Sequence, residues 1–208
     1  ALRQALADDT VGQILIDIDS PGGSVYGVSE LADEILSARA QKPVVAIANS
    51  LAASAAYWIG CSASEFYVTP SGEVGSIGVW QVHVDQSQAL AAEGIAPTLI
   101  SAGKYKVEGN PYQPLDGDAR AFMQSRVDDY YATFIKAVAR GRGVPIGQVR
   151  EGMGQGRVLG ADAALVEGMV DGVATFDDVV RKMRRDAKVS VTPRASRLAS
   201  ARNALAIA

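Results

Sequence analysis

The chain has 208 residues, of which 48% are hydrophobic and 21% charged, enough for one large hydrophobic core or two small ones. A formal net charge of −3 gives no electrostatic reason to expect nucleic acid as a partner. The single cysteine excludes an internal disulfide and a cysteine-rich metal site, and the single histidine leaves little for a histidine-based metal cluster. We therefore expect neither a metal ion nor a cofactor.

In the first third of the chain, short apolar runs typical of strands alternate with segments whose apolar residues follow the spacing of a helix. Short strands separated by helical segments predict an α/β protein with a largely parallel sheet. The elements expected here are a helix over 1–8, a strand over 11–19, a helix over 28–36, a strand over 44–48, a buried alanine-rich helix over 52–63 and a strand over 66–68.

The rest of the chain continues the pattern around one long irregular segment. A loop of about fifteen residues, 101–115, is rich in glycine and proline, and a loop of this length is usually functional or disordered. The elements expected around it are a strand-like segment over 75–80, a helix over 86–93 closed by Gly94, a strand over 98–100, a long helix ended by Gly141 and Gly143, shorter elements over 146–152, 158–159, 161–166 and 169–171, and a helix over 175–185 with a Thr175–Asp178 capping box. From residue 188 the periodicity disappears, which predicts a core domain over 1–187 and a flexible tail over 188–208.

Ser20-Pro21-Gly22-Gly23 stands between a buried strand and a helix. Two adjacent glycines leave backbone N–H groups free to point at a ligand, and the start of the helix adds positive potential, which suits a developing oxyanion. The same sequence is also an ordinary strand-to-helix turn.

Ser54 lies in Ala52-Ala-Ser-Ala-Ala-Tyr57, near the start of the alanine-rich helix and beyond the carboxyl end of a strand. Active sites of α/β sheets gather at that edge, and the N–H of Ala55 is available to an oxyanion. A small residue that lets helices pack closely explains the same pattern.

Lys104 and Lys106 lie in the long loop. A lysine acts as a general base only when burial or a neighbouring cation lowers its pKa. Most loop lysines are solvated, so the loop alone does not separate a base from a surface charge.

Taken in order, these segments resemble the S49 serine peptidases, which are signal-peptide-peptidase-A-like enzymes with a Clp-protease/crotonase type of fold. The resemblance runs from about residue 1 to 188. The motifs that carry it are Asp17-Ile-Asp-Ser-Pro-Gly-Gly23, Ala52 to Tyr57, Gly72-Glu-Val-Gly-Ser-Ile-Gly-Val79, Tyr105-Lys106 with Pro111 five residues later, Gly141-Arg-Gly143 and Gly156-Arg-Val-Leu-Gly-Ala-Asp162.

The resemblance implies a Ser–Lys dyad, with Ser54 as nucleophile and Lys106 as general base. It assigns Gly23 and Ala55 to the oxyanion hole, with Gly22 as the less favoured alternative to Gly23, and it places Gly22 and Ser76 in substrate binding. Many relatives carry Gly-Gly where this chain has Ala55-Ala56, and alanine keeps the N–H.

The version of the motifs here resembles the phage and prophage branch most, whose members mature capsid and other head proteins. That implies a protein or peptide substrate, phage scaffold or portal proteins as partners, a ring-like homo-oligomer and a place in the host cytoplasm or the virion. The chain opens without methionine, no apolar run approaches the roughly 20 residues of a membrane span and no signal peptide is recognisable. We expect a truncated N-terminus, with membrane association only through a segment before residue 1.

Four alternatives stay open. A Ser54–His83–Asp85 triad would replace the dyad, because related Clp-type enzymes use Ser–His–Asp. A cellular peptidase that degrades signal peptides would share the dyad and differ in substrate. A crotonase-type acyl-CoA enzyme would use the glycine turn without a covalent nucleophile, and an inactive scaffold protein would use neither.

Overall fold

The computed structural model describes residues 1–187, so the predicted tail over 188–208 lies outside the described residues. The chain forms two compact units. We call Ala1–Ile77 together with the chain from Phe134 onward the core unit, and Gly78–Thr133 the inserted unit.

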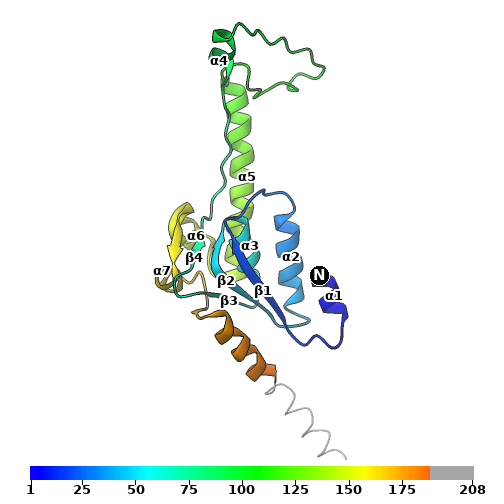
Figure 1. Cartoon of the computed structure of the whole chain (residues 1–208), viewed down its shortest axis with the longest axis vertical. Helices are drawn as coiled ribbons and strands as arrows, with labels where there is room; N and C mark the ends of the chain where they lie inside the picture. The colour runs from blue at the N-terminus through cyan, green and yellow to red at the C-terminus, as the bar shows by residue number, and fades with distance from the viewer. Residues whose placement is uncertain (188–208) are drawn as a thin grey trace, which may run out of the picture. The chain divides into compact units, whose positions relative to one another are not determined.

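The core unit is built on one six-stranded sheet (Figure 1). Strand β2 pairs in parallel with β1, β3 and β4, and β3 pairs in parallel with β6, while β4 and β5 are antiparallel. This mostly parallel sheet with flanking helices confirms the predicted α/β class. The strands are β1 (Ile14–Ser20), β2 (Val44–Ala53), β3 (Glu65–Val68), β4 (Glu73–Gly75), β5 (Val158–Gly160) and β6 (Gly172–Val173).

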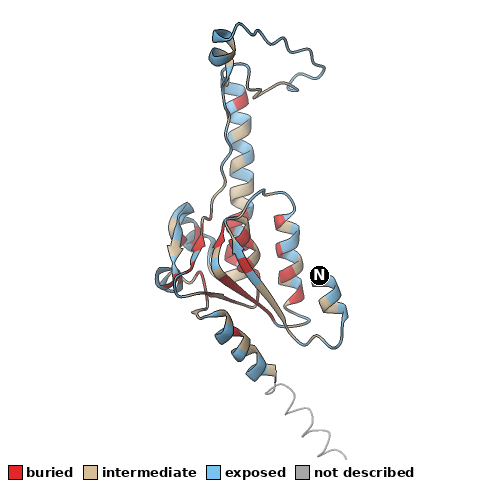
Figure 2. Cartoon of the chain, in the orientation of Figure 1, coloured by how far each residue is buried: buried red, intermediate tan, exposed pale blue. Residues whose placement is uncertain are grey.

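Helices cover both faces of this sheet. Helix α3 packs against β1 and β2, and α2 packs against α3 and buries one apolar stripe (Figure 2). On the other face, Val45 and Ile47 of β2 pack against Val179 of a helix over 176–187. The remaining elements of the core unit are α1 (Leu2–Ala7), α2 (Val28–Ala38), α3 (Ala55–Gly60), α6 (Ile146–Glu151), a 3-10 turn (Met153–Gly156) and α7 (Ala161–Val166). The Thr175–Asp178 capping box forms as predicted, with the Asp178 N–H donating to Thr175 Oγ1.

An ion pair between the buried side chain of Arg142 and the partly exposed carboxylate of Asp171 ties the end of the long helix α5 (Gly117–Arg142) to the sheet. Both terminal nitrogens of Arg142 donate to the Asp171 carboxylate at 2.8 Å, and Asp171 also accepts the Phe66 N–H at 2.7 Å. Burial works to raise the pKa of Asp171, but its hydrogen bonds to Arg142 and Phe66 hold that pKa below the usual value. Burial alone raises the pKa of the nearby Cys61 thiol to about 12.

The inserted unit consists of residues 78–86, which we call the extended segment, helix α4 (Ser87–Ala92), the loop over 101–115 and the first part of α5. Among residues 78–133, all of which the structure describes, Ala119 alone is buried. Large apolar side chains are exposed instead, including Trp80 at 80% and Ile100 at 95%. The unit therefore has almost no hydrophobic core of its own.

Five predicted elements were wrong in type or extent. β2 continues through Ala53 because Leu51–Ala53 pair with β4, so helix α3 begins only at Ala55. The strand-like segment predicted over 75–80 is not a strand beyond Gly75, where β4 ends. Residues 98–100 are exposed and form no strand. Helix α5 runs past Gly141 and ends at Arg142. A Cβ on Gly141 would lie 2.3 Å from the Cys61 carbonyl oxygen, so glycine at this position permits close packing against the end of α3.

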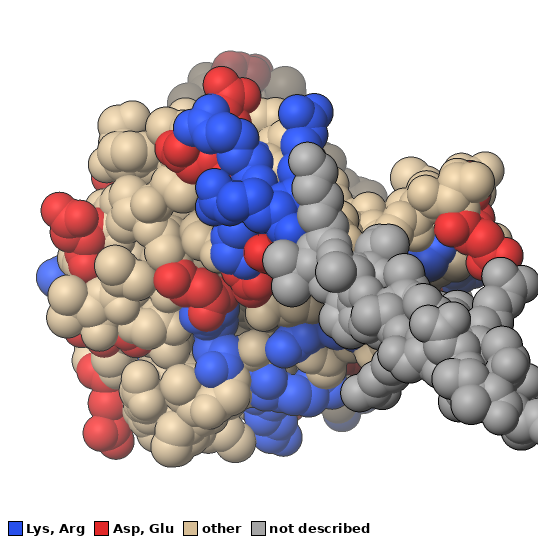
Figure 3. All heavy atoms as spheres, turned by 90° about the horizontal axis from the view of Figure 1, so that it is seen from below, with Lys and Arg blue, Asp and Glu red and all other residues tan. Residues whose placement is uncertain are grey.

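Basic and acidic side chains lie side by side on the face in Figure 3. On the helix over 176–187, Arg181 pairs with Asp178, and Lys182 pairs with Glu65 and Asp186. In the part of the chain that the structure describes, no helix combines the length and the apolar character needed to cross a bilayer.

Candidate active site

Ser54 occupies the sharp turn between β2 and α3. Its backbone has φ 54° and ψ −122°, a conformation that residues other than glycine seldom adopt and that is concentrated at functional sites. Two hydrogen bonds hold it: the Ser54 N–H donates to the Gly75 carbonyl oxygen at 2.7 Å, and the Trp58 N–H donates to the Ser54 carbonyl at 3.0 Å. The serine is thus presented at the carboxyl end of the central strand.

The glycine turn packs directly against this serine. Ser20, the last residue of β1, is paired with Ala52 of β2, so the turn that follows reaches the start of α3. Gly22 has φ 98°, and a Cβ built on it would lie 2.7 Å from the Ser54 Cβ and 3.0 Å from the Ala55 nitrogen. A side chain at position 22 would displace Ser54, which explains the glycine.

The N–H groups of this turn differ in their partners. The Gly22 N–H donates to Ser20 Oγ at 3.2 Å, whereas Gly23 is exposed and a Cβ on it would meet nothing within 4 Å. This difference favours Gly23 over Gly22 as the oxyanion donor.

A cavity of about 470 Å³ opens at Ala55 and Ala56, the residues that follow Ser54, which does not itself line it. It lies between β1, the glycine turn and the first turns of α3, and its lining includes Gly22, Gly23, Ala55, Ala56 and Ile59. The core unit therefore brings together the predicted nucleophile segment, both predicted oxyanion residues and a space for an acyl group.

Ser76 follows the residue whose carbonyl accepts the Ser54 N–H. It has φ 53°, and its own N–H donates to the Arg157 carbonyl at 2.8 Å, which anchors the end of β4 to β5. Ser76 is half-buried, and its role in substrate binding stays a prediction.

Lys106 lies in the inserted unit, on the loop over 101–115, and is exposed there. Its N–H donates to the Gly103 carbonyl at 3.1 Å, and it forms no ion pair within residues 1–187. The Lys104 ammonium instead lies 4.7 Å from the centre of the Tyr105 ring. The pairing of Lys106 with Ser54 stays a prediction.

His83 and Asp85 form their hydrogen bonds with different residues. His83 Nε2 lies 2.9 Å from the Asn110 carbonyl oxygen, and the Asp85 carboxylate accepts the N–H of Ser87, the first residue of α4. Hydrogen bonding to the Ser87 side chain, then to its N–H, holds the pKa of Asp85 below its usual value, and the charge of His83 adds a smaller lowering effect. No hydrogen bond joins His83 to Asp85 within residues 1–187, so the second half of a triad is not assembled.

Sequence reasoning missed two parts of this geometry. The Gly75 carbonyl that holds Ser54 was not predicted, because a contact between β4 and the end of β2 leaves no local pattern. The bond from His83 to Asn110 was missed as well, although Asn110-Pro111 marks a turn in the loop. Within the described residues no group of three or more histidine, cysteine, aspartate or glutamate side chains is arranged to hold a metal ion.

Comparison with known proteins gives consistent matches. The model of peptidase family S49 matches residues 37–190. Capsid assembly protease C of Escherichia phage lambda is 37% identical over 183 residues, which cover 88% of this chain and 41% of that protein. Head-tail preconnector protein GP5 of Enterobacteria phage P21 is 40% identical over 167 residues, covering 80% and 32%.

A bacterial relative extends the comparison beyond phages. Protease 4 of Salmonella typhi is 32% identical over 189 residues, or 90% of this chain and 30% of that protein. The chain therefore spans less than half the length of each of these three relatives. The family model covers well over half of the chain, including the whole Ser54 segment and the loop with Lys106. The chain belongs to peptidase family S49, the serine-type peptidases that its sequence motifs resemble.

Proposed function

We propose that the chain is a serine endopeptidase that works through a Ser54–Lys106 dyad. The observation that carries the proposal is the backbone of Ser54, held at positive φ against the glycine turn with a cavity beside it. A hydroxyl alone is a weak nucleophile and needs a base within reach. Lys106 is the base that the family motif supplies.

The proposed reaction is acyl transfer in two steps. Ser54 Oγ attacks the scissile carbonyl and gives its proton to the neutral amine of Lys106, and the oxyanion accepts hydrogen bonds from the N–H groups of Gly23 and Ala55. Lys106 then protonates the departing amine as the C–N bond breaks. A water molecule, deprotonated by the same lysine, attacks the acyl ester, and the proton returns to Ser54 as the ester bond breaks.

The substrates we propose are phage head proteins. Two of the relatives are a capsid assembly protease and a head-tail preconnector protein, and each covers four fifths of the chain or more. Purified chain incubated with the scaffold and portal proteins of its own phage head should cut at least one of them. A protein that cuts only signal peptides would refute this choice of substrate.

The working form that we propose is a ring-like homo-oligomer whose subunits share active sites. The inserted unit exposes large apolar side chains and has almost no core, so a second copy is needed to cover them. Lys106 is exposed in the single chain, whereas a neutral lysine needs an environment that excludes water. An interface between copies would cover the apolar side chains and exclude water from Lys106.

Complementation between inactive subunits tests the shared site. Ser54→Ala and Lys106→Ala chains are mixed under conditions that exchange subunits, and mixing is verified by native mass spectrometry. Interfaces that join an intact serine to an intact lysine should restore cleavage. Verified mixing without activity would place both residues in one subunit, and a monomer in solution would refute the ring.

A further inference from the structure

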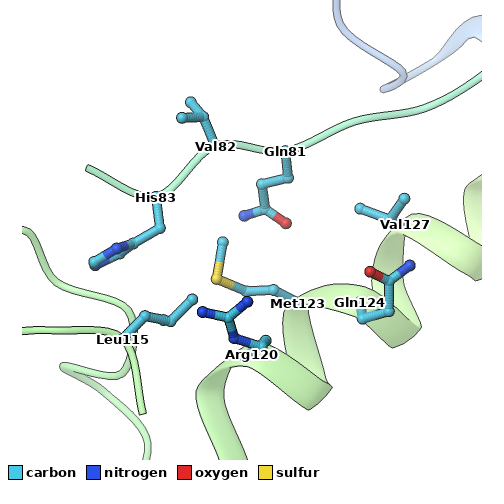
Figure 4. A pocket seen from close by; sticks show the side chains of 8 residues that line it. All are labelled: Gln81, Val82, His83, Leu115, Arg120, Met123, Gln124 and Val127. Atoms are coloured by element: carbon cyan, nitrogen blue, oxygen red, sulfur yellow. The ribbon is translucent and has the colours of Figure 1, made fainter. Parts of the chain in front are cut away.

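His83, the one histidine of the chain, is bonded to the loop that carries Lys106. Its Nε2 lies 2.9 Å from the Asn110 carbonyl oxygen, so Nε2 carries the proton, because a carbonyl oxygen only accepts. Figure 4 shows His83 and Gln81 on one side of the extended segment and Val82 on the other. The histidine is half-buried, whereas Val82 is 62% exposed. The segment therefore directs its imidazole at the loop.

Asn110 connects the His83 hydrogen bond to the neighbouring residues of the loop through its own side chain. Its side-chain Nδ2 donates to the Val107 carbonyl at 2.7 Å, and its Oδ1 accepts the Tyr112 N–H at 2.9 Å. Val107 follows Lys106 directly. The peptide between Val107 and Glu108, one residue beyond the proposed base, is therefore two hydrogen bonds away from His83.

Further contacts seat the same end of the loop. The Gln86 N–H donates to the Pro111 carbonyl at 2.8 Å, and the position of a Cβ on Gly109 lies 3.6 Å from the Met123 sulfur. His83 and Met123 line a cavity of about 400 Å³ between the extended segment and α5 (Figure 4). Of the two hydrogen bonds between the extended segment and the loop, both within the described residues, the His83 bond is the one that a side-chain substitution can remove.

We propose that His83 is a positioning residue for Lys106. Its Nε2–H holds the Asn110 carbonyl and thereby the loop conformation that presents the base. The proposal rests on the proposed role of Lys106, and the imidazole transfers no proton in it. Misplacing a reacting group by about 1 Å costs about 100-fold in rate, so a relaxed loop has a large effect.

Three substitutions separate this role from that of a general base. His83→Gln places an amide N–H near the position of Nε2, His83→Asn places one near Nδ1 and too short to reach, and His83→Ala has none. Neither amide can act as a base. We expect His83→Ala and His83→Asn to lose about 100-fold in kcat with little change in KM. His83→Gln should recover most of that loss.

Full activity of His83→Ala would overturn the proposal. So would a His83→Gln protein as inactive as His83→Ala, the result that a Ser–His–Asp triad predicts.

Hydrogen exchange gives a readout that needs no activity. In a Ser54→Ala background, the amides of residues 103–112 should exchange faster in His83→Ala and His83→Asn than in the parent, and His83→Gln should restore the slow rate. Equal exchange in all four proteins would refute the anchor. Restored exchange together with a fully active Lys106→Ala protein would instead leave the anchor in place and refute Lys106 as the base.

Discussion

The turn beside Ser54 offers a matched pair of substitutions, Gly22→Ala and Gly23→Ala. A Cβ on Gly22 would lie 2.7 Å from both the Ala53 carbonyl oxygen and the Ser54 Cβ, and 3.0 Å from the Ala55 nitrogen. A Cβ on Gly23 would meet nothing within 4 Å. The two variants add the same atom one residue apart, against Ser54 in one and in open space in the other.

The structure sets the size of the effect. Ordinary contacts begin near 3.4 Å, so the Gly22→Ala turn has to move by about 0.7 Å relative to Ser54. A displacement of that order predicts a loss of about 100-fold in kcat/KM. The positive φ of residue 22 adds about 1–2 kcal/mol of strain. In a chain of 208 residues, that lowers the melting temperature by roughly 2–8 °C, so the protein stays folded.

The assay measures the rate at which a fluorophosphonate labels Ser54 and the rate of casein cleavage, each beside a melting curve. Gly22→Ala should lose both rates while Gly23→Ala keeps both, because alanine retains the Gly23 N–H. Equal rates in the two variants, whether both high or both low, would refute the argument from close packing.

The remaining predictions concern the dyad, the Arg142–Asp171 ion pair and the cysteine. Ser54→Ala and Lys106→Ala should each abolish casein cleavage with melting temperatures near wild type, because the Ser54 hydroxyl makes no hydrogen bond within residues 1–187 and Lys106 is exposed; residual cleavage above background would exclude that residue from the dyad. Asp171→Ala should cost about 3 kcal/mol in urea unfolding, at the low end for a buried pair because the Asp171 side chain is 37% exposed, and an unchanged midpoint would refute the strength assigned to its bond with Arg142. Because the native pKa of Asp171 is lowered, its contribution is complete above about pH 4 and is lost as the pH falls through that lowered pKa. Stability should thus fall less between about pH 6 and about pH 3 in Asp171→Ala than in wild type. Cys61, whose pKa burial raises to about 12, should react with a disulfide reagent near neutral pH only after unfolding, and fast reaction of the native protein would contradict its burial.

The strands with continuous apolar character could be predicted from sequence, although only β2 is buried along most of its length and β1 is mostly half-buried. The runs beginning at Ile14 and Val44 became paired parallel strands with these two residues in register. The segment over 98–100 has similar residues but no neighbouring strand, and pairing rather than local preference decides a strand.

The candidate site residues could be identified from sequence motifs, whereas the contacts that arrange them in space could not be predicted. Ser54 and the glycine turn were found from their motifs, because small residues and adjacent glycines stand out in a sequence. Their approach depends on the register that sets Ser20 opposite Ala52, and on the Gly75 carbonyl that holds the serine, contacts between segments far apart in the chain. The link from His83 to Asn110 is hidden for the same reason.

Mapping a fluorophosphonate adduct by mass spectrometry tests the central claim, that Ser54 is a nucleophile activated by Lys106. Wild-type chain, Lys106→Ala and the matched control Lys104→Ala are treated alike, digested and sequenced. The account predicts an adduct on Ser54 in the wild type and in Lys104→Ala, with almost none in Lys106→Ala. An adduct on another serine, or equal labelling of Ser54 in all three proteins, would contradict it.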